Sequence, residues 1–413
     1  MITRIFNICL YSLLFSSSLS AQLTAQVKFF STKGTSIIGT DGKPFFIKGT
    51  NLGNWLVPEG YMFLFKDATS PRLINQTLTE LVGPEKTKAF WRKYLEVYIT
   101  GEDIHYLKSI GMNSIRVPFN YRLFTNENYM GDNDSTRGFK IFDRLLRWCR
   151  KEKLYVILDM HCAPGGQTGD NIDDGFGYPF LFENEEEIKQ CARIWKRIAA
   201  RYKYESIIIG YDLLNEPIAH YFDKQKLNPL LEPVYKQISQ AVREVDKDHL
   251  LFLGGAQWDS DFKPFGTPYD PKVVYTFHKY WTEPTRAVIQ DYVDFGKKFN
   301  VPIYCGETGE NTDAWVETFR KMLDSNSVGW HFWPYKKINN TRGIVTFSKP
   351  VYYDSVITYA NTPRKNFEDI RKNQPRNREE IEKALDGFLE NCQFRNCTEN
   401  VGYIKALGFR TKE

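Results

Sequence analysis

The stretch Ile207-Ile208-Ile209-Gly210-Tyr211-Asp212-Leu213-Leu214-Asn215-Glu216-Pro217 carries the clearest structural signal in the chain. Its run of β-branched and aliphatic residues is typical of a strand buried on both faces of a parallel sheet. Pro217 has no backbone N–H and predicts that the strand does not continue past this point. We therefore expect Asn215 and Glu216 at the carboxyl end of a buried strand.

Glu216 is a candidate proton donor because of this position. A carboxyl group at the end of an apolar strand loses water on one side, which raises its pKa and suits it to donate a proton near neutral pH. A polar pair that merely opens a loop or caps a helix would have the same local sequence. Glu216 therefore needs a catalytic partner elsewhere in the chain.

On both sides of this stretch, buried strands alternate with helices or long loops along most of the chain. The strand patterns cover residues 44–48, 114–119, 154–161, 207–216, 250–255, 273–280, 301–307 and 328–333, and the helical patterns cover residues 86–98, 102–110, 141–153, 185–202, 230–245, 286–298 and 313–323. This alternation predicts an α/β fold, a (β/α)8 TIM barrel. A doubly wound open sheet would need a glycine-rich phosphate turn after its first strand, and the sequence has none.

The domain organisation follows from what surrounds these strands. Arg4, the apolar residues 5–15 and the small residues ending at Ala21 predict a signal peptide over residues 1–21, and hence a secreted or periplasmic protein. The turn dipeptide Asp41-Gly42 predicts a hairpin between residues 36–38 and 44–48. Without a repeat or linker, we predict one barrel domain with loop insertions over residues 22–365. A C-terminal helical extension over residues 366–413 is predicted to pack on the barrel.

Composition excludes several partner classes. The chain has 55 basic and 50 acidic residues and is 42% hydrophobic, so it can bury a large core and lacks a disordered signature. It has no Lys/Arg cluster interleaved with aromatics, so we expect no nucleic-acid partner. After residue 21 no apolar stretch is long enough to span a bilayer, and we expect a monomer.

Cysteine and histidine spacing gives no indication of a metal. His161, Cys162 and Asp170 are too loosely spaced to predict a metal site, so neither a metal nor another cofactor is expected. Cys392 and Cys397 lie close together in a polar tail. The sequence leaves open whether they form a disulfide.

The carboxyl ends of all eight strands of such a barrel meet on one face, where catalytic and binding residues gather. The candidates there, in chain order, are Asn51, Trp55 and Glu59 after the first strand, Arg116 after the second, His161 and then Asn171 after the third, Asn215 and Glu216 after the fourth, Trp258 after the fifth, His278 and Tyr280 at the sixth, Glu307 at the seventh and Trp333 at the eighth. His105, His220 and His249 lie on predicted helices or loops, and we assign them no site role.

Glu307 supplies the partner that Glu216 requires. Glycoside hydrolysis needs a protonated acid and an ionised carboxylate on opposite sides of the scissile bond. Arg116 and Tyr280 can stabilise a charged Glu307, while apolar surroundings keep Glu216 protonated. The sequence therefore predicts two carboxyl groups with two different tasks.

The sequence resembles glycoside hydrolase family 5, the cellulase family. The resemblance rests on five ordered motifs: residues 208–218 around Asn215-Glu216-Pro217, Gly306-Glu307, Arg116-Val117-Pro118, His278-Lys279-Tyr280 and Trp330-His331-Phe332-Trp333. It implies that Glu216 is the acid/base, Glu307 the nucleophile and Asn215 the contact to the sugar 2-hydroxyl. It further implies that Arg116 and Tyr280 orient Glu307, that His161 and His278 line the cleaved subsite, and that Trp333 is its stacking floor.

Within that family, residues 51–59 and 161–167 resemble fungal-type exo-β-1,3-glucanases. The chain departs from them at Asn54 and Cys162, where those enzymes usually have glycine. Glu59, Trp258 and Trp281 are expected near the substrate from their order in the chain alone.

The leading hypothesis is a secreted retaining β-glycosidase that acts on a β-glucan or related β-glucoside. The alternatives are a non-catalytic carbohydrate-binding barrel and a glycolipid-directed β-glycosidase, which would need an apolar shelf beside the mouth. The sequence leaves the linkage and the endo or exo mode open.

Overall fold

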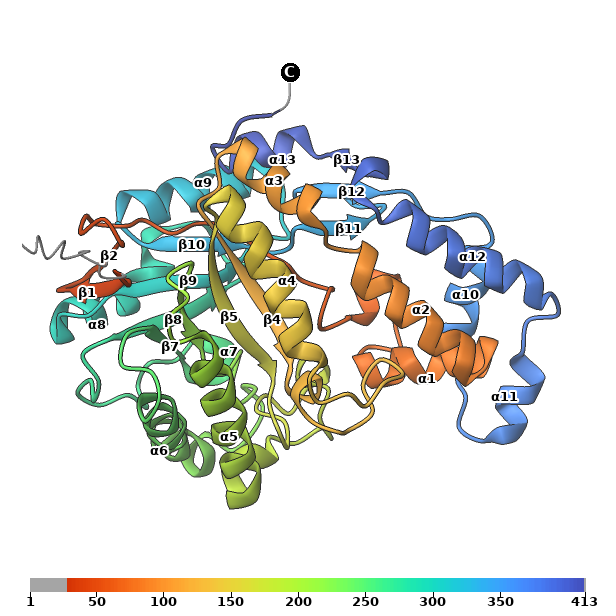
Figure 1. The fold of residues 1–413 in the computed structure, drawn as a ribbon, viewed down its shortest axis with the longest axis horizontal. Coiled ribbons are helices and arrows are strands. Elements are labelled where there is room, and N and C mark those ends of the chain that lie inside the picture. The colour runs from red at the N-terminus through yellow and green to blue at the C-terminus, as the bar shows by residue number, and fades with distance from the viewer. Residues whose placement is uncertain (1–27, 412–413) are drawn as a thin grey trace, which may run out of the picture.

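The computed structural model describes residues 28–411 and has a closed barrel of eight parallel strands at its centre (Figure 1). The barrel strands are β3 (Lys48–Asn51), β4 (Ser114–Asn120), β5 (Tyr155–Cys162), β6 (Ile208–Asp212), β7 (Leu250–Gly254), β8 (Val273–Lys279), β9 (Ile303–Thr308) and β10 (Gly329–Phe332). Each strand pairs with the next in chain order, and β10 closes the barrel against β3. The predicted (β/α)8 TIM barrel is confirmed.

Two predicted strand boundaries were wrong, and the register explains both. The first strand begins only at Lys48, because the ladder to β10 starts with the pair Trp330 and Lys48. Pro44 instead forms an isolated antiparallel bridge with Ile38. The predicted hairpin is thus reduced to this bridge and its turn, while β2 (Ser36–Ile38) pairs with β1 (Ser31–Lys33). Strand β6 ends at Asp212, so Glu216 lies in the loop that follows it.

The helices lie around the barrel, as the alternation in sequence predicted (Figure 1). They are α1 (Pro71–Val82), α2 (Pro84–Val97), α3 (Gly101–Ile110), α4 (Arg137–Glu152), α5 (Glu185–Tyr202), α6 (Lys224–Arg243), α7 (Ala256–Asp259), α8 (Gln290–Phe299), α9 (Asp313–Ser325), α10 (Tyr353–Ala360), α11 (Phe367–Asn373), α12 (Arg378–Asn391) and α13 (Val401–Ala406). Helix α3 shows why such elements have sharp ends. Thr100 and Asp103 form a capping box at its start, and Gly111 ends it at a φ of 113°.

The C-terminal segment contacts the rest of the protein through α12 and β13. Helix α12 packs against α1, α2 and α10, and the Phe388 ring stacks on Phe63 at 4.9 Å between ring centroids. Strand β13 (Thr398–Glu399) joins a small sheet with β12 (Val345–Phe347) and β11 (Lys336–Ile338). Cys392 and Cys397 are both free thiols in this structure.

The predicted signal peptide over residues 1–21 lies outside the described part of the chain. Within residues 28–411, no helix combines the length and the apolar composition that crossing a membrane requires.

Candidate active site

A cavity of about 570 Å³ opens where the carboxyl ends of the barrel strands meet. Its lining residues are Glu59, Tyr61, His161, Asp170, Ile172, Glu216, Gln257, Trp258, Ser260, His278, Lys279, Tyr280, Trp281, Thr282, Glu307, Glu310 and Trp333. Most of the predicted site residues are among them. Arg116 and Asn215 are fully buried beneath the lining, and Asn171 is not part of it, although its neighbours Asp170 and Ile172 are.

The buried guanidinium of Arg116 organises the floor of the cavity. Its Nη1 atom lies 2.5 Å from Oε1 of Glu307, and its Nε donates to Oδ2 of Asp212 at 2.8 Å. Its Nη2 lies 3.0 Å from Oδ1 of Asp159 and donates to Oδ1 of Asn215 at 2.9 Å. Strands β4, β5, β6 and β9 supply these charged groups, so the barrel itself fixes their relative positions.

Glu307 is held from two sides. Besides Arg116, the Tyr280 hydroxyl donates to its Oε2 at 3.0 Å. Burial raises the pKa of Glu307, whereas the charge of Arg116, the nearby His161 and the Tyr280 hydrogen bond act in the opposite direction. Both carboxylate oxygens therefore have a fixed donor.

Glu216 has a different environment. Its Oε1 lies 2.9 Å from Nδ1 of His278, and no arginine contacts its carboxyl group in the described part of the chain. Burial, followed by the charge of Glu307, raises the pKa of Glu216 well above its ordinary value. Of the two glutamates, Glu216 is thus the one whose protonated form is favoured more strongly.

The two glutamates approach the same nitrogen of His278. Nδ1 of His278 is 2.9 Å from Glu216 and 3.8 Å from Oε2 of Glu307. One ligand atom each of Glu216, His278 and Glu307 lies within 4.8 Å of the others. Burial lowers the pKa of His278 well below its ordinary value, so the imidazole between the carboxyl groups is uncharged.

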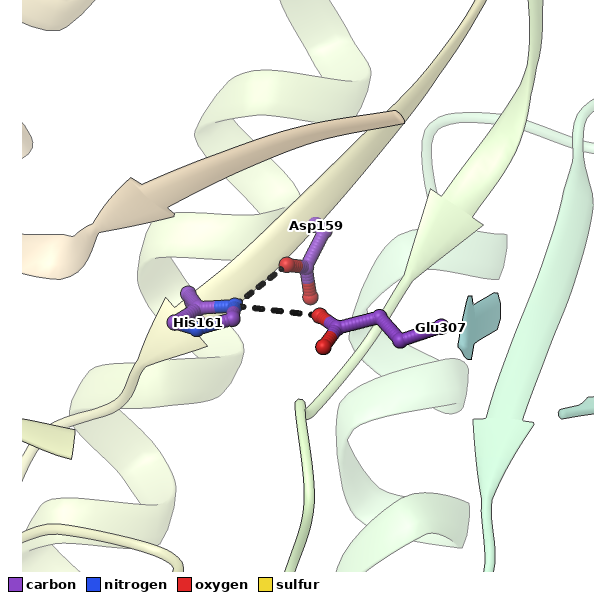
Figure 2. Close-up of side chains that lie close together, drawn as sticks. All are labelled: Asp159, His161 and Glu307. Atoms are coloured by element: carbon purple, nitrogen blue, oxygen red, sulfur yellow. Dashed lines mark hydrogen bonds and ion pairs between the residues drawn. The ribbon is translucent and has the colours of Figure 1, made fainter. Parts of the chain in front are cut away.

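His161 and Trp333 form the wall of the cavity next to Glu307. Figure 2 shows a ring nitrogen of His161 directed at the carboxyl groups of Asp159 and Glu307. This Nδ1 atom lies 2.9 Å from Oδ2 of Asp159 and 4.0 Å from Oε1 of Glu307. Burial lowers the pKa of His161 to about 4. The Trp333 indole stacks on the His161 ring at 5.7 Å, and its Nε1 donates to the Tyr61 hydroxyl at 2.7 Å.

Two clusters of carboxylate and imidazole side chains have the spacing of metal ligands. One is Asp159, His161 and Glu307 (Figure 2), and the other is Glu216, His278 and Glu307. Both sets depend on Glu307. Its two oxygens are already bound by Arg116 and Tyr280, so a cation would have to compete with a fixed positive charge.

Sequence reasoning missed several residues of the site. Asp159 lies within β5, so the strand-end rule does not select it. Asp212 is the last residue of β6, but the sequence predicted that strand to run on to Glu216, which placed Asp212 in its interior. Glu310 binds Lys337 beside the cavity, and the exposed Trp281 forms part of its wall. Of these two only Glu310 was missed, because Trp281 was expected near the substrate from its order in the chain.

A (β/α)8 barrel with paired carboxyl groups at the carboxyl ends of its strands is the architecture of the barrel glycoside hydrolases. Among these, the chain belongs to the cellulase family, glycosyl hydrolase family 5, whose model matches residues 76–339. The resemblance seen in the sequence motifs is confirmed.

Relatives from this comparison differ in their named activities. Over 270 residues the chain is 34% identical to a β-xylosidase of Phanerodontia chrysosporium, covering 65% of this chain and 52% of that protein. It is 30% identical over 207 residues to a glucan 1,3-β-glucosidase of Candida oleophila, covering 46% and 47%. The chain thus spans about half the length of these two relatives. Among solved structures, Thermotoga maritima Cel5A in complex with cellobiose superposes with a TM-score of 0.51 at 18% identity, covering 88% and 97%.

Proposed function

We propose that the chain is an exported retaining β-glycosidase that hydrolyses O-glycosidic bonds of a β-glucan or related β-glucoside by double displacement. The observation that carries this proposal is the approach of Glu216 and Glu307, whose facing atoms lie within 4.8 Å. Retaining enzymes place their two carboxyl groups about 5–5.5 Å apart, whereas inverting enzymes need about 6.5–9.5 Å to admit a water.

In the first step Glu307 is the nucleophile. Its carboxylate attacks the anomeric carbon while the bond from that carbon to the leaving-group oxygen breaks, and Glu216 gives its proton to that oxygen. The donors from Arg116 and Tyr280 hold the attacking group in one orientation. The raised pKa of Glu216 supports its role as the acid.

In the second step Glu216 acts as the base. Its carboxylate takes a proton from a water molecule, whose oxygen attacks the anomeric carbon as the bond to Glu307 breaks. The leaving Glu307 carboxylate regains its contact with Arg116. Both carboxyl groups return to their starting states, so no cofactor is needed.

The remaining predicted residues have positions that suit sugar binding. Trp333 offers a flat face beside His161, on which a pyranose ring can stack. Oδ1 of Asn215 accepts a hydrogen bond from Arg116, and its Nδ2 lies 3.5 Å from Nε2 of His161, which holds the amide just beneath the cavity lining. Its proposed contact to the substrate 2-hydroxyl rests on the family resemblance. Glu59 is buried at the cavity wall, and its Oε1 has no hydrogen-bond partner among the described residues, so it can accept from a sugar hydroxyl.

An apolar aglycone is a second possibility within the same chemistry. Trp281 lines the cavity with most of its surface exposed, and Trp258 lies on the same lining. Such a rim favours a leaving group with an apolar or flat face, and it supports a glycolipid-directed β-glycosidase as the alternative. The paired glutamates, with two fixed donors on Glu307, argue against a binding barrel without catalysis.

Export and domain division complete the proposal. Residues 1–21 are proposed to direct export and residues 22–365 to form the catalytic barrel, with residues 366–413 as an extension packed on it. The α12 contacts with α1 and α2 support this last assignment.

The mechanism is tested by the configuration of the first product. Incubated with a panel of β-glucans and β-glucosides, the full-length protein should release a sugar whose β anomer appears first by proton NMR and then mutarotates. A first-formed α anomer would overturn double displacement. Absence of sugar release across a panel that the protein binds would instead favour the non-catalytic barrel, with Glu307→Gln protein as the background control.

A further inference from the structure

Asp259 is a fully buried carboxylate that reaches two parts of the acid/base machinery through one oxygen. Its Oδ2 accepts from the backbone N–H of Glu216 at 3.2 Å and lies 3.2 Å from Nε2 of His278. His278 in turn faces the Glu216 carboxyl through Nδ1 at 2.9 Å. Asp259 therefore lies behind both the acid and the imidazole that contacts it.

The short turn α7 (Ala256–Asp259), which carries Asp259 in the loop after β7, has an unusual backbone. Gln257, Trp258 and Asp259 all have left-handed conformations, with φ of 51°, 57° and 57°. Such conformations are unfavourable for residues other than glycine and persist only where surrounding bonds enforce them. Here the side chains of Gln257 and Asn228 exchange hydrogen bonds of 2.8 and 3.2 Å, which anchor the loop to α6.

Two glycines make room for the arrangement. A Cβ atom on Gly254 would lie 2.0 Å from Oδ1 of Asp259, and one on Gly306 would lie 2.7 Å from Nε2 of His278. Side chains at either position would displace the carboxylate or the ring. The chain thus carries glycine at the two positions that the contact between Asp259 and His278 requires.

The contact with Asp259 bears on which nitrogen of His278 holds the proton. Oδ2 of Asp259 lies 3.2 Å from Nε2 in a charge contact outside hydrogen-bond geometry, and burial raises the pKa of Asp259 well above its ordinary value. The same oxygen already accepts from the Glu216 N–H, so it faces Nε2 as an acceptor and favours a proton on that nitrogen. Nδ1 then carries a lone pair and faces the Glu216 carboxyl. The groups that face the ring are Glu216, Glu307 at 3.8 Å and Asp259, and of these only a protonated carboxyl can donate to Nδ1.

We propose that Asp259 is a positioning residue for proton donation: it fixes the backbone of Glu216 and holds the His278 proton on Nε2, so that Nδ1 accepts a hydrogen bond from the protonated Glu216 carboxyl. This inference rests on the proposed function, because it takes Glu216 as the acid. Asp259 itself touches no reacting atom.

The test uses leaving-group dependence in the full-length chain. Asp259→Asn, with Asp261→Asn from the same loop as matched control, is assayed on dinitrophenyl β-glucoside, which needs little acid help, and on phenyl β-glucoside, which needs more. We expect Asp259→Asn to lower kcat/KM about 100-fold on the phenyl substrate and less than about 5-fold on the dinitrophenyl substrate, since acid catalysis contributes about 100- to 10,000-fold. Asp261→Asn should match the wild type on both.

Equal loss on the two substrates would overturn the inference, because a merely structural defect lowers the active fraction without regard to leaving group. Glu216→Gln distinguishes a failure of the positioning role of Asp259 from a failure of the acid role of Glu216. If Glu216→Gln loses activity selectively on phenyl β-glucoside and Asp259→Asn does not, only the role of Asp259 fails. If Glu216→Gln loses activity equally on both, the acid role of Glu216 fails as well.

A second measurement does not depend on whether Asp259→Asn folds. Nitrogen-15 NMR of histidine-labelled wild-type protein, with the His278 signals assigned from His278→Gln, reports which ring nitrogen is protonated. A protonated Nε2 with a bare Nδ1 is expected. The opposite tautomer in the wild type would overturn the inference.

Discussion

Nη1 of Arg116 lies 2.5 Å from Oε1 of Glu307, at the floor of the cavity, where the guanidinium is fully buried and the Glu307 side chain is only 6% exposed. The same guanidinium also contacts Asp159 and Asp212, so one positive charge serves three carboxyl groups. Burial without full charge compensation raises the pKa of Asp159 and of Asp212 to about 7 each. The direct contact with Arg116 and the Tyr280 hydroxyl therefore determines how readily Glu307 ionises among these neighbours.

Arg116→Lys keeps the positive charge but removes the planar guanidinium, whose separate nitrogens contact several groups at once. A single ammonium cannot reach Glu307, Asp159 and Asp212 at once, so at least one buried carboxylate loses its partner. We expect a loss of about 3–5 kcal/mol in the free energy of unfolding and a fall in kcat of at least about 100-fold, measured by urea unfolding and by turnover. Arg201→Lys, at a half-exposed pair with Asp143, is the control and should change the stability by less than about 1 kcal/mol.

Glu307→Gln should abolish turnover, because an amide is a poor nucleophile. We expect kcat to fall by at least about 10,000-fold on every β-glycoside that the wild type cleaves. Glu317→Gln, on an exposed turn of α9, is the control and should retain full activity. Near-normal turnover by Glu307→Gln would rule out its role as the nucleophile.

The pH profile of kcat/KM should be bell-shaped, with one limb for each glutamate. Activity is lost as pH falls through the pKa of Glu307, which must be ionised, and as pH rises through the pKa of Glu216, which must be protonated. Since burial raises the pKa of Glu216 well above its ordinary value, the alkaline limb should lie well above that of an exposed glutamate. With dinitrophenyl β-glucoside, Glu216→Gln should lose the alkaline limb and keep the acid limb. Persistence of both limbs would assign the alkaline one to another group.

The sequence predicted the barrel and most of the cavity, because strand period and strand-end polarity are local patterns. It placed Glu216 at the end of a strand, whereas the structure places it beyond Asp212 with a φ of 46°. Asp259 was not predicted, because its approach to His278 depends on left-handed backbone in a loop that no local pattern indicates. Asn171 was predicted and does not line the cavity, since order along a long loop does not determine which side chains point inward.

Phe388→Ala tests how firmly the C-terminal extension belongs to the fold. The Phe388 ring is fully buried. It contacts Phe63 in the segment before α1, Tyr94 on α2 and Tyr353 on α10. Its loss should lower the free energy of unfolding by about 3–5 kcal/mol, as for other buried phenylalanines. Phe367→Ala, at a side chain that is 79% exposed on α11, should be nearly neutral. A small effect at Phe388 would mean that the extension unfolds separately from the barrel.

Trp281→Ala tests whether the aromatic rim binds the leaving group. The side chain is 75% exposed and lines the cavity, so its removal should cost little stability while removing a stacking surface. We expect kcat/KM to fall about 10-fold on β-glucosides with large apolar or aromatic aglycones, corresponding to about 1.4 kcal/mol of lost binding in the transition state, and to stay unchanged on methyl β-glucoside. Tyr204→Ala is the matched control, because Tyr204 is also 75% exposed but does not line the cavity. An equal fall on both kinds of substrate would place Trp281 at the sugar rather than at the aglycone, and no change on either would remove the apolar rim from substrate recognition.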